Sequence, residues 1–214
     1  MNVNISGELT ITDYTEDEAH QIKASLVTEN PTWVTAMSMN KSLWGIEPKL
    51  RFYTEANNTI TAPVGFLSSL KIINPNLQID DNRYYSKTPI QIEFTGELRD
   101  YQKTAVDVLS NTTNGVLCSI TASGKTVIAC ALLAKLKQPT LILVDTIELA
   151  HQFIARLKQF TSVKNIGKIG AGERKIKQIT VGLLQSVKKI DQSELNKFGM
   201  IICDEVLTRS TYYV

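Results

Sequence analysis

The sequence predicts an α/β domain built around a parallel sheet, preceded by a small α+β domain. From Leu98 onward, apolar runs alternate with segments whose apolar residues recur at helical spacing. Two runs, Leu141–Val144 and Met200–Cys203, are apolar at every position, which is typical of strands buried on both faces of a parallel sheet. Before residue 89 the pattern differs, because a short helix is surrounded by alternating and aromatic-rich segments.

The first domain is expected to span residues 1–88. Thr15 and Glu18 have the spacing of a capping box, and apolar residues at helical spacing follow them until Asn30-Pro31 ends the helix. Asn57-Asn58 predicts a hairpin turn. Extended segments are expected at Glu8–Thr12, Trp33–Met37, Lys49–Thr54 and Thr59–Ala62.

The second domain is expected to span residues 89–214. A polar, poorly periodic stretch at about 74–89 is expected to link it to the first domain. Its alternating strands and helices are expected at Gly115–Ile120, Lys125–Lys137, Thr140–Val144, Glu148–Phe160, Ile179–Leu183 and Met200–Cys203.

Composition favours a soluble protein and argues against a membrane span. Of the 214 residues, 43% are hydrophobic and 21% are charged. No apolar run approaches the ~18 residues that a membrane-spanning helix needs, so we expect a cytoplasmic location. The three cysteines lie in apolar runs, which predicts small buried side chains and not metal ligands. Residues 156–189 hold nine Lys/Arg against one acid, which favours either contact with nucleic-acid phosphates or an ordinary solvated face.

The strongest chemical signal is the segment 119–126, Ser-Ile-Thr-Ala-Ser-Gly-Lys-Thr, between a predicted strand and a predicted helix. It matches the second half of the P-loop pattern, in which backbone N–H groups at a helix N-terminus cradle phosphate. Lys125 is expected to reach the β- and γ-phosphates of ATP, and the Thr126 hydroxyl is expected to coordinate Mg²⁺. The alternative is a chance Gly-Lys-Thr on a surface turn. Backbone contacts to the nucleotide are expected from Thr121, Ala122, Ser123 and Gly124.

Two carboxylates support this interpretation. Asp204 and Glu205 directly follow the apolar run Met200–Cys203, and strand ends of a parallel sheet face the ligand crevice. Asp204 is expected to hold Mg²⁺ through its water shell. Glu205 is expected to orient or deprotonate the attacking water, which phosphoryl transfer needs besides positioning.

Together these elements resemble superfamily 2 helicases of the DEAD/DEAH-like kind. Leu98–Ala105 is similar to the family element in which Arg99 and Gln102 would contact adenine. Val144–Gln152 resembles an element that contacts a nucleic-acid backbone, and Val181–Ser186 resembles the next one. The resemblance implies a RecA-like P-loop NTPase domain, and it extends more weakly over residues 1–88 to the accessory domain of UvsW-type phage helicases. The implied nucleic-acid contacts are Thr146, Glu148, Gln185 and Ser186.

The departures from the family pattern shape the expected function. Leu207 stands where the family has histidine, and Leu183 stands where it has threonine. The sequence stops at Val214, so a motor truncated after its second nucleotide motif is expected, with the second RecA-like domain supplied in cis or in trans. The expected function is the ATP-binding portion of a helicase or translocase that acts on nucleic acid, with DNA favoured over RNA. The alternative is a non-enzymatic nucleic-acid-binding remnant; if the protein is phage-encoded, its compartment is the host cytoplasm.

The aromatic residues of the first domain have two interpretations. Trp33, Trp44, Phe52 and Tyr53 are expected to fill its core, because a small domain needs large side chains to bury enough area. Stacking on nucleobases is the alternative. His20 and His151 are expected to face solvent, since no nucleophile accompanies either of them.

Overall fold

The computed structural model describes residues 1–86 and 88–204. They divide into two compact units, and the boundary along the sequence lies between Arg83 and Tyr84. Each unit has its own sheet and its own buried core. In the described part of the chain, no helix is long and apolar enough to cross a membrane.

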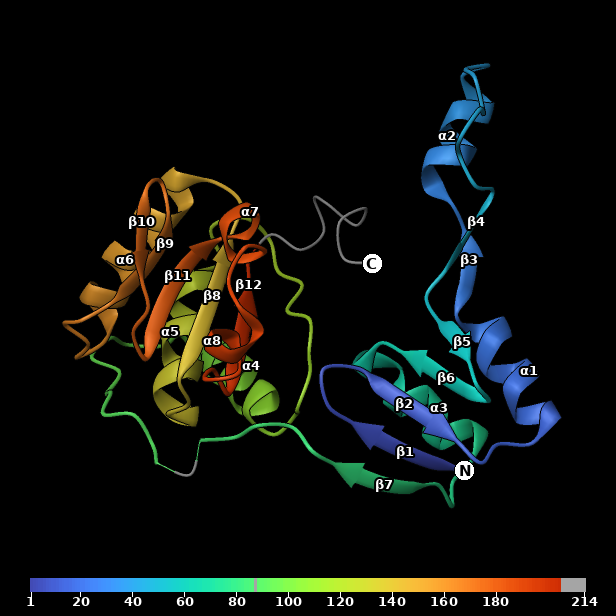
Figure 1. Ribbon diagram of the computed structural model, residues 1–214. Helices are drawn as coiled ribbons and strands as arrows, with labels where there is room; N and C mark the ends of the chain where they lie inside the picture. Colours follow the sequence, from blue (N-terminus) through green and yellow to red (C-terminus); the bar gives the residue numbers. More distant parts are fainter. Residues whose placement is uncertain (87, 205–214) are drawn as a thin grey trace. The chain divides into compact units, whose positions relative to one another are not determined.

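The first unit is a five-stranded sheet with the order β5-β6-β2-β1-β7 and two helices that contribute to its core (Figure 1). All pairings in it are antiparallel except β1 with β7. Its core is formed by the buried side chains of β1, β2 and β6, with Ile22 of α1 and Leu70 of α3 packed against them. The elements are β1 (Asn2–Ile5), β2 (Leu9–Thr12), α1 (Glu16–Ser25), β5 (Thr54–Ala56), β6 (Thr59–Ala62), the 3-10 helix η1 (Val64–Phe66), α3 (Leu67–Ile73) and β7 (Gln78–Asp81).

Two local signals in this unit are confirmed. Thr15 caps α1, since its hydroxyl accepts a hydrogen bond from the Glu18 N–H at 3.2 Å and the Glu18 carboxylate accepts one from the Thr15 N–H at 2.7 Å. These bonds satisfy two backbone donors of the Thr15 to Glu18 turn. Asn57 and Asn58 both have positive φ, which makes the turn between β5 and β6 the type that matches the twist of a hairpin.

The expected strand at Trp33–Met37 is wrong, because these residues lie in the helix α2 (Pro31–Ser38). Asn30 does not end one helix but begins the next: its side chain accepts from the Thr32 N–H at 3.0 Å, and Pro31 occupies the first helical turn. Proline is well tolerated there because the first N–H groups of a helix have no helical partner. The β-branched and aromatic composition that favoured a strand is a weaker determinant than this cap.

The stretch 74–89 contains the strand β7, which the polar sequence pattern did not indicate. β7 pairs in parallel with β1, and the Gln78 N–H donates to the Met1 carbonyl at 3.0 Å. All four residues of β7 are exposed, so hydrophobic periodicity contains no trace of it. Backbone hydrogen bonds to β1 hold this strand in the sheet.

The second unit has a five-stranded sheet with the order β10-β9-β11-β8-β12, in which only β10 is antiparallel to its neighbour. The α/β fold with a parallel sheet is therefore confirmed. The elements are α4 (Asp100–Ser110), α5 (Lys125–Leu136), β8 (Thr140–Val144), α6 (Ile147–Phe160), β9 (Gly167–Gly170), β10 (Glu173–Lys175), β11 (Ile179–Leu183), α7 (Leu184–Val187), α8 (Gln192–Leu195) and β12 (Met200–Cys203).

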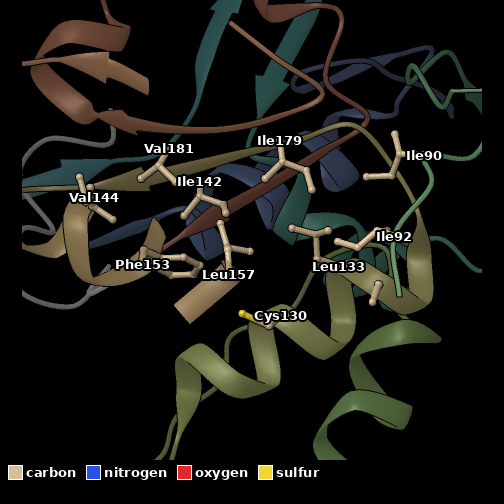
Figure 2. Close-up of a cluster of buried hydrophobic side chains, with 12 residues drawn as sticks. Ile90, Ile92, Cys130, Leu133, Ile142, Val144, Phe153, Leu157, Ile179 and Val181 are labelled. Atoms are coloured by element: carbon tan, nitrogen blue, oxygen red, sulfur yellow. The ribbon is translucent and has the colours of Figure 1, made fainter. Parts of the chain in front are cut away.

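Helices α5 and α6 cover one face of this sheet. Cys130 and Leu133 of α5 and Phe153 of α6 meet Ile142 of β8 and Val181 of β11 in one buried cluster (Figure 2). Burial raises the pKa of the Cys130 thiol to about 12. A second cluster that includes Leu141, Ile169, Val187 and Phe198 covers the other face. Helix α4 packs on α5 through Val106, Ile128 and Ala131.

The expected strand at Gly115–Ile120 is wrong, because these residues form no strand. Val116 and Ile120 are 73% and 82% exposed, and Cys118 is also exposed, contrary to its expected burial. A strand forms only where a neighbour completes its hydrogen-bond ladder. In the described sheet the order ends with β12, whose Ile201 is 62% exposed. β12 is therefore an edge strand and is not buried on both faces as its apolar sequence predicted.

Candidate nucleotide site

The loop that precedes α5 has the backbone shape of a phosphate cradle. Ala122 and Gly124 adopt left-handed conformations with φ of 62° and 82°, and Gly124 is the residue from which α5 begins. The Gly124 carbonyl accepts from the Val127 N–H at 2.9 Å and from the Ile128 N–H at 3.1 Å. The earlier N–H groups of the helix have no partner within it, so they are free to bind an anion. Of the predicted loop residues, Thr121 and Ala122 are exposed, Ser123 is buried, and Gly124, Lys125 and Thr126 are half-buried.

Lys125 reaches back across its own loop. Its Nζ donates to the carbonyl oxygens of Ser119 and Ile120 at 3.0 Å and 3.1 Å. Neutral carbonyls are weaker partners for an ammonium group than phosphate oxygens, because bonds between ionised groups are roughly twice as strong. The ammonium is therefore held at the loop by contacts that an anionic ligand can replace.

Helix α4 supplies a buried clamp on this loop. The Gln102 side chain is 5% exposed; its Nε2 donates to the Ser123 carbonyl at 3.0 Å, and its Oε1 accepts from the Arg99 N–H at 3.0 Å. The Tyr101 hydroxyl donates to the same Ser123 carbonyl at 2.7 Å, and an Arg99 guanidinium nitrogen donates to the Tyr101 hydroxyl at 3.3 Å. The structure thus joins Gln102 directly to the loop and places Arg99 beside Gln102 and Tyr101, while the predicted contact of Arg99 and Gln102 with adenine stays a prediction. Tyr101 was not predicted as a site residue, although it lies inside the same motif.

Close packing between Gln102 and Gly124 fixes the loop's position. A Cβ atom at Gly124 would lie 2.5 Å from the Gln102 Nε2, which is shorter than real contacts allow. Glycine is therefore needed here both for its positive φ and for its missing side chain. Beside it, the Ser123 Oγ is buried and has no hydrogen-bond partner. Unpaired buried hydroxyls are uncommon in folded proteins, and this one lies in the loop where a polar ligand would bind.

The predicted acidic residue Asp204 lies at the carboxyl end of the sheet. Its N–H donates to the Leu143 carbonyl of β8 at 3.0 Å, which continues the pairing of β12 with β8 beyond Cys203. β11 ends beside β8 at the same edge, since Leu183 pairs with Val144. Within the described residues, no hydrogen bond joins the Asp204 side chain to the loop 121–126. Glu205 and Leu207 lie outside the described residues.

The donors available for a divalent cation are oxygens. No group of three His, Cys, Asp or Glu side chains in residues 1–86 and 88–204 has the arrangement of a metal site. A Mg²⁺ ion does not require one, because it keeps several waters and takes one or two protein ligands together with substrate phosphates. A threonine hydroxyl and one carboxylate, Thr126 and Asp204, are donors of the right chemistry for such an ion.

The four predicted nucleic-acid contacts lie near the same strand ends. The Thr146 hydroxyl caps α6 by accepting from the Leu149 N–H at 3.3 Å. Hydrogen bonds from its own N–H and from the Thr146 hydroxyl hold the pKa of Glu148 below its usual range, so this carboxylate stays ionised. Gln185 is exposed and Ser186 is half-buried in α7, directly after β11.

The basic segment 156–189 is partly neutralised within the fold. Lys168 donates to the Glu173 carboxylate at 2.9 Å and lies 3.1 Å from the exposed His151 ring, and Arg174 pairs with Glu194. The Arg156 guanidinium lies 6.0 Å from the centre of the Phe160 ring. The net positive charge of this segment is therefore a weaker indication of a nucleic-acid surface than its sequence suggested.

Fold and loop together place the chain in the class of RecA-like domains of superfamily 2 helicases, and comparisons with known proteins agree. Over 110 residues the chain is 37% identical to the DNA 3'-5' translocase XPB2 of Sulfurisphaera tokodaii. The matched segment covers 51% of this chain and 25% of that protein. Over 165 residues it is 34% identical to a mimivirus protein (Acanthamoeba polyphaga mimivirus) provisionally named an ATP-dependent RNA helicase, covering 72% of this chain and 30% of that protein. The chain thus matches less than a third of the length of either relative.

The structure titled "The crystal structure of T4 UvsW" has the same fold. It superposes with a TM-score of 0.65 at 21% sequence identity, covering 96% of this chain and 47% of that one. The family described as "Type III restriction enzyme, res subunit" matches residues 95–207, which is more than half of the chain, and the chain belongs to that family. The superfamily inferred from the motifs is therefore confirmed.

Proposed function

We propose that this chain is the nucleotide-binding portion of an ATP-dependent motor that translocates on DNA or unwinds it. One observation supports the proposal most: the clamp that joins Gln102 and Tyr101 to the left-handed loop in front of Lys125. In this clamp Gln102, the proposed adenine-binding residue, directly contacts the loop that is proposed to bind phosphate. The names of the two relatives refer to a translocase on DNA and to an RNA helicase.

The unused hydrogen-bonding groups of Gln102 suit adenine. A glutamine amide offers two N–H donors and two carbonyl lone pairs, and the fold uses one of each, with Ser123 and Arg99. The remaining donor and acceptor match the N7 acceptor and N6 donor of adenine. Guanine presents an O6 acceptor instead of the N6 donor, so a Gln102 contact of this kind favours ATP over GTP.

The remaining roles follow from charge and position. Lys125 would exchange its two carbonyl partners for β- and γ-phosphate oxygens of ATP, with the loop N–H groups of Thr121, Ala122, Ser123 and Gly124 around them. Thr126 and Asp204 would hold Mg²⁺, which neutralises phosphate charge when bound. Glu205 would position the attacking water. Strand-backbone contacts would come from Thr146, Glu148, Gln185 and Ser186 at the same sheet edge.

We assign the complete motor a second RecA-like domain, contributed in cis or in trans. In the proposed motor, a charge-stabilising arginine would come from that domain, and such a residue accelerates phosphoryl transfer by roughly 10³–10⁵-fold. Residues 1–214 alone are therefore expected to bind ATP without robust strand separation. DNA is favoured over RNA as the substrate because the name of the 37% identical relative specifies DNA.

The test is a binding titration with a fluorescent ATP analogue in the presence of Mg²⁺. Wild type is compared with Lys125→Ala and with Lys103→Ala, a control that removes an exposed lysine of α4. Lys125→Ala should weaken binding by at least 10-fold, since bonds between charged groups contribute about 1.5–3 kcal/mol, and Lys103→Ala should not. A competing titration with GTP should show weaker binding, and Gln102→Ala should reduce the difference.

Two results contradict the proposal. Equal ATP affinity in wild type and Lys125→Ala would place the nucleotide elsewhere or nowhere. Salt-sensitive DNA binding that neither ATP nor Lys125→Ala alters would instead favour a nucleic-acid-binding remnant without motor function.

A further inference from the structure

A projecting arm of the first unit displays apolar side chains that the fold does not use. The arm comprises residues 27–51: the strands β3 (Val27–Glu29) and β4 (Lys49–Arg51) pair antiparallel, and α2 with the following loop lies at their far end (Figure 1). None of its residues belongs to the buried core of the unit or packs against it. The arm is therefore not stabilised by burial in that core.

Polar contacts hold the arm's shape instead. Asn30, 9% exposed, caps α2 with its side-chain oxygen, and its Nδ2 donates to the Glu47 carbonyl at 2.8 Å. The Asn30 N–H donates to the Pro48 carbonyl at 3.0 Å, and the Lys41 N–H donates to the Ala36 carbonyl at 2.8 Å. One residue thus joins the helix to the returning strand. The tip has a defined backbone before any ligand is present.

Trp44 is the most conspicuous side chain of this tip. It is 93% exposed, so its expected place in the core is wrong. Trp33 is half-buried but also lies outside the core cluster, whereas Phe52 and Tyr53 do pack against the core as predicted. Met37 and Met39 on the same tip are 57% and 58% exposed. An almost fully exposed tryptophan is unusual, because the indole ring has a large apolar surface that folded proteins usually pack against other side chains.

The groove near Trp44 is lined by both apolar and polar residues. It has a volume of about 430 Å³, and its lining combines the apolar residues Pro31, Ala36 and Ile46 with the hydroxyl residues Thr32, Thr35 and Ser42 and with Lys41. The Ser42 Oγ accepts from the Trp44 N–H at 3.3 Å, which ties the tryptophan's backbone to this lining. A lysine and hydroxyl groups close to an exposed aromatic ring are the kinds of group that hold a single nucleic-acid strand, which needs a positive charge for phosphate and a ring for a base.

The charges of the first unit also favour binding of a nucleic-acid strand at the arm. Residues 27–51 hold three Lys/Arg against two acids, whereas the rest of residues 1–83 holds three against eight. The arm therefore has a net charge of +1 and the rest of the unit a net charge of −5. An acidic body repels a phosphate chain, so such a chain would approach the unit at the arm.

We propose that the arm binds single-stranded nucleic acid, with a base stacked on Trp44 and a neighbouring phosphate paired with Lys41. This inference rests on the proposed function, since it gives the first unit a hold on the strand that the nucleotide-binding unit acts upon. Stacking on an aromatic face tolerates any base, so the contact is sequence-independent. That property suits a motor that moves along its substrate.

The test uses the full chain and a fluorescently labelled oligothymidylate of about 12 nucleotides, a length within the range of single-strand sites. Fluorescence anisotropy gives the dissociation constant for wild type, Trp44→Ala, Trp44→Phe and the control Ile72→Ala, which removes an 82%-exposed side chain of α3 outside the arm. Trp44→Ala should weaken binding roughly 5- to 150-fold. Trp44→Phe should recover part of the affinity, and Ile72→Ala should match wild type.

A second readout isolates the stacked ring. Trp33→Phe leaves Trp44 as the only tryptophan of the chain, and oligothymidylate should quench its fluorescence. Lys41→Ala should lower the slope of log affinity against log salt by about 0.7, the value for one phosphate contact on a single strand. Lys71→Ala, on α3, should leave the slope unchanged.

Three outcomes overturn the inference. Oligothymidylate binding that is equal in wild type and Trp44→Ala, without quenching, would place the strand elsewhere on the chain. Binding that disappears equally in Ile72→Ala would show a non-specific effect. A change in oligomeric state on Trp44→Ala, measured by analytical ultracentrifugation and without any quenching, would identify the arm as a contact between copies. None of these depends on ATP affinity, so failure of the nucleotide proposal is recognised separately in the Lys125 titration.

Discussion

Replacing Gly124 by alanine should destabilise the second unit more than the same replacement at Gly172. Both glycines have nearly the same positive φ, 82° and 81°. A Cβ at Gly172 meets nothing within 4 Å, whereas one at Gly124 lies 2.5 Å from the Gln102 Nε2. The pair therefore separates the cost of a left-handed backbone from the cost of a steric clash.

The magnitude follows from the contacts that each alanine disturbs. A left-handed conformation costs a non-glycine residue about 1–2 kcal/mol, and both variants incur it. At Gly124 the Gln102 amide must also move, which breaks its bonds to Ser123 and Arg99 and leaves buried polar groups unpaired. An unpaired buried group costs about 1–3 kcal/mol, so Gly124→Ala should exceed Gly172→Ala by that amount.

Urea unfolding followed by far-UV circular dichroism measures the difference, with the two units fitted as separate transitions. Tryptophan fluorescence is unsuitable because both tryptophans, Trp33 and Trp44, lie in the first unit. A double variant, Gln102→Ala with Gly124→Ala, should lose less stability than the sum of the two single changes, since the clash is then absent. Equal destabilisation by the two glycine variants, or strict additivity in the double variant, would refute the close approach of Gln102 to the loop.

Two further predictions concern titratable groups. Thiol labelling at pH 8, followed by mass spectrometry, should modify exposed Cys118 first and Cys203 slowly, because burial raises the pKa of Cys203. Cys130, with its pKa raised to about 12, should react only on unfolding. Prompt labelling of Cys130 would contradict the packing of α5. The hydrogen bond from the Thr15 N–H is the main cause that holds the pKa of Glu18 below its usual range, and other hydrogen bonds contribute less. The stabilisation by ionised Glu18 is therefore present above the pKa that this carboxyl has in the unfolded chain, and it is lost as pH falls through the pKa in the folded chain. The gap in unfolding free energy between wild type and Glu18→Gln should therefore be largest near pH 7 and shrink below about pH 4; a gap that widens on acidification would show that the capping box is not formed.

Features fixed by neighbours in sequence were predictable. The capping box of Thr15 and Glu18, the Asn57-Asn58 hairpin and the Gly124-Lys125 loop each depend on a few consecutive residues. Their side chains satisfy or shape a backbone within one turn of themselves, so the rest of the fold has little influence on them. The contact of Gln102 with the loop was predictable only through the family resemblance, because 21 residues separate its partners.

Features that depend on a distant partner were not predictable. β7 is exposed at every position and exists only because β1 offers an edge. Residues 115–120 show the reverse, since their apolar sequence suits a buried strand and the described sheet gives them no partner. Hydrophobic pattern reports which side chains favour burial, and pairing decides whether a strand forms.

Trp44 shows the same limit at the level of function. From the sequence alone, Trp44 and Phe52 are equally good candidates for the core. Only Phe52, eight residues later, packs on it. What separates them is their position: Trp44 lies on the arm, whose helix and returning strand are joined by the polar bonds of Asn30, and its indole is 93% exposed. An aromatic residue next to an element closed by polar caps is therefore a better candidate for ligand binding than one next to an element that needs a core. By that criterion, Trp44 is the tryptophan or tyrosine of the first unit with the clearest claim to a binding role.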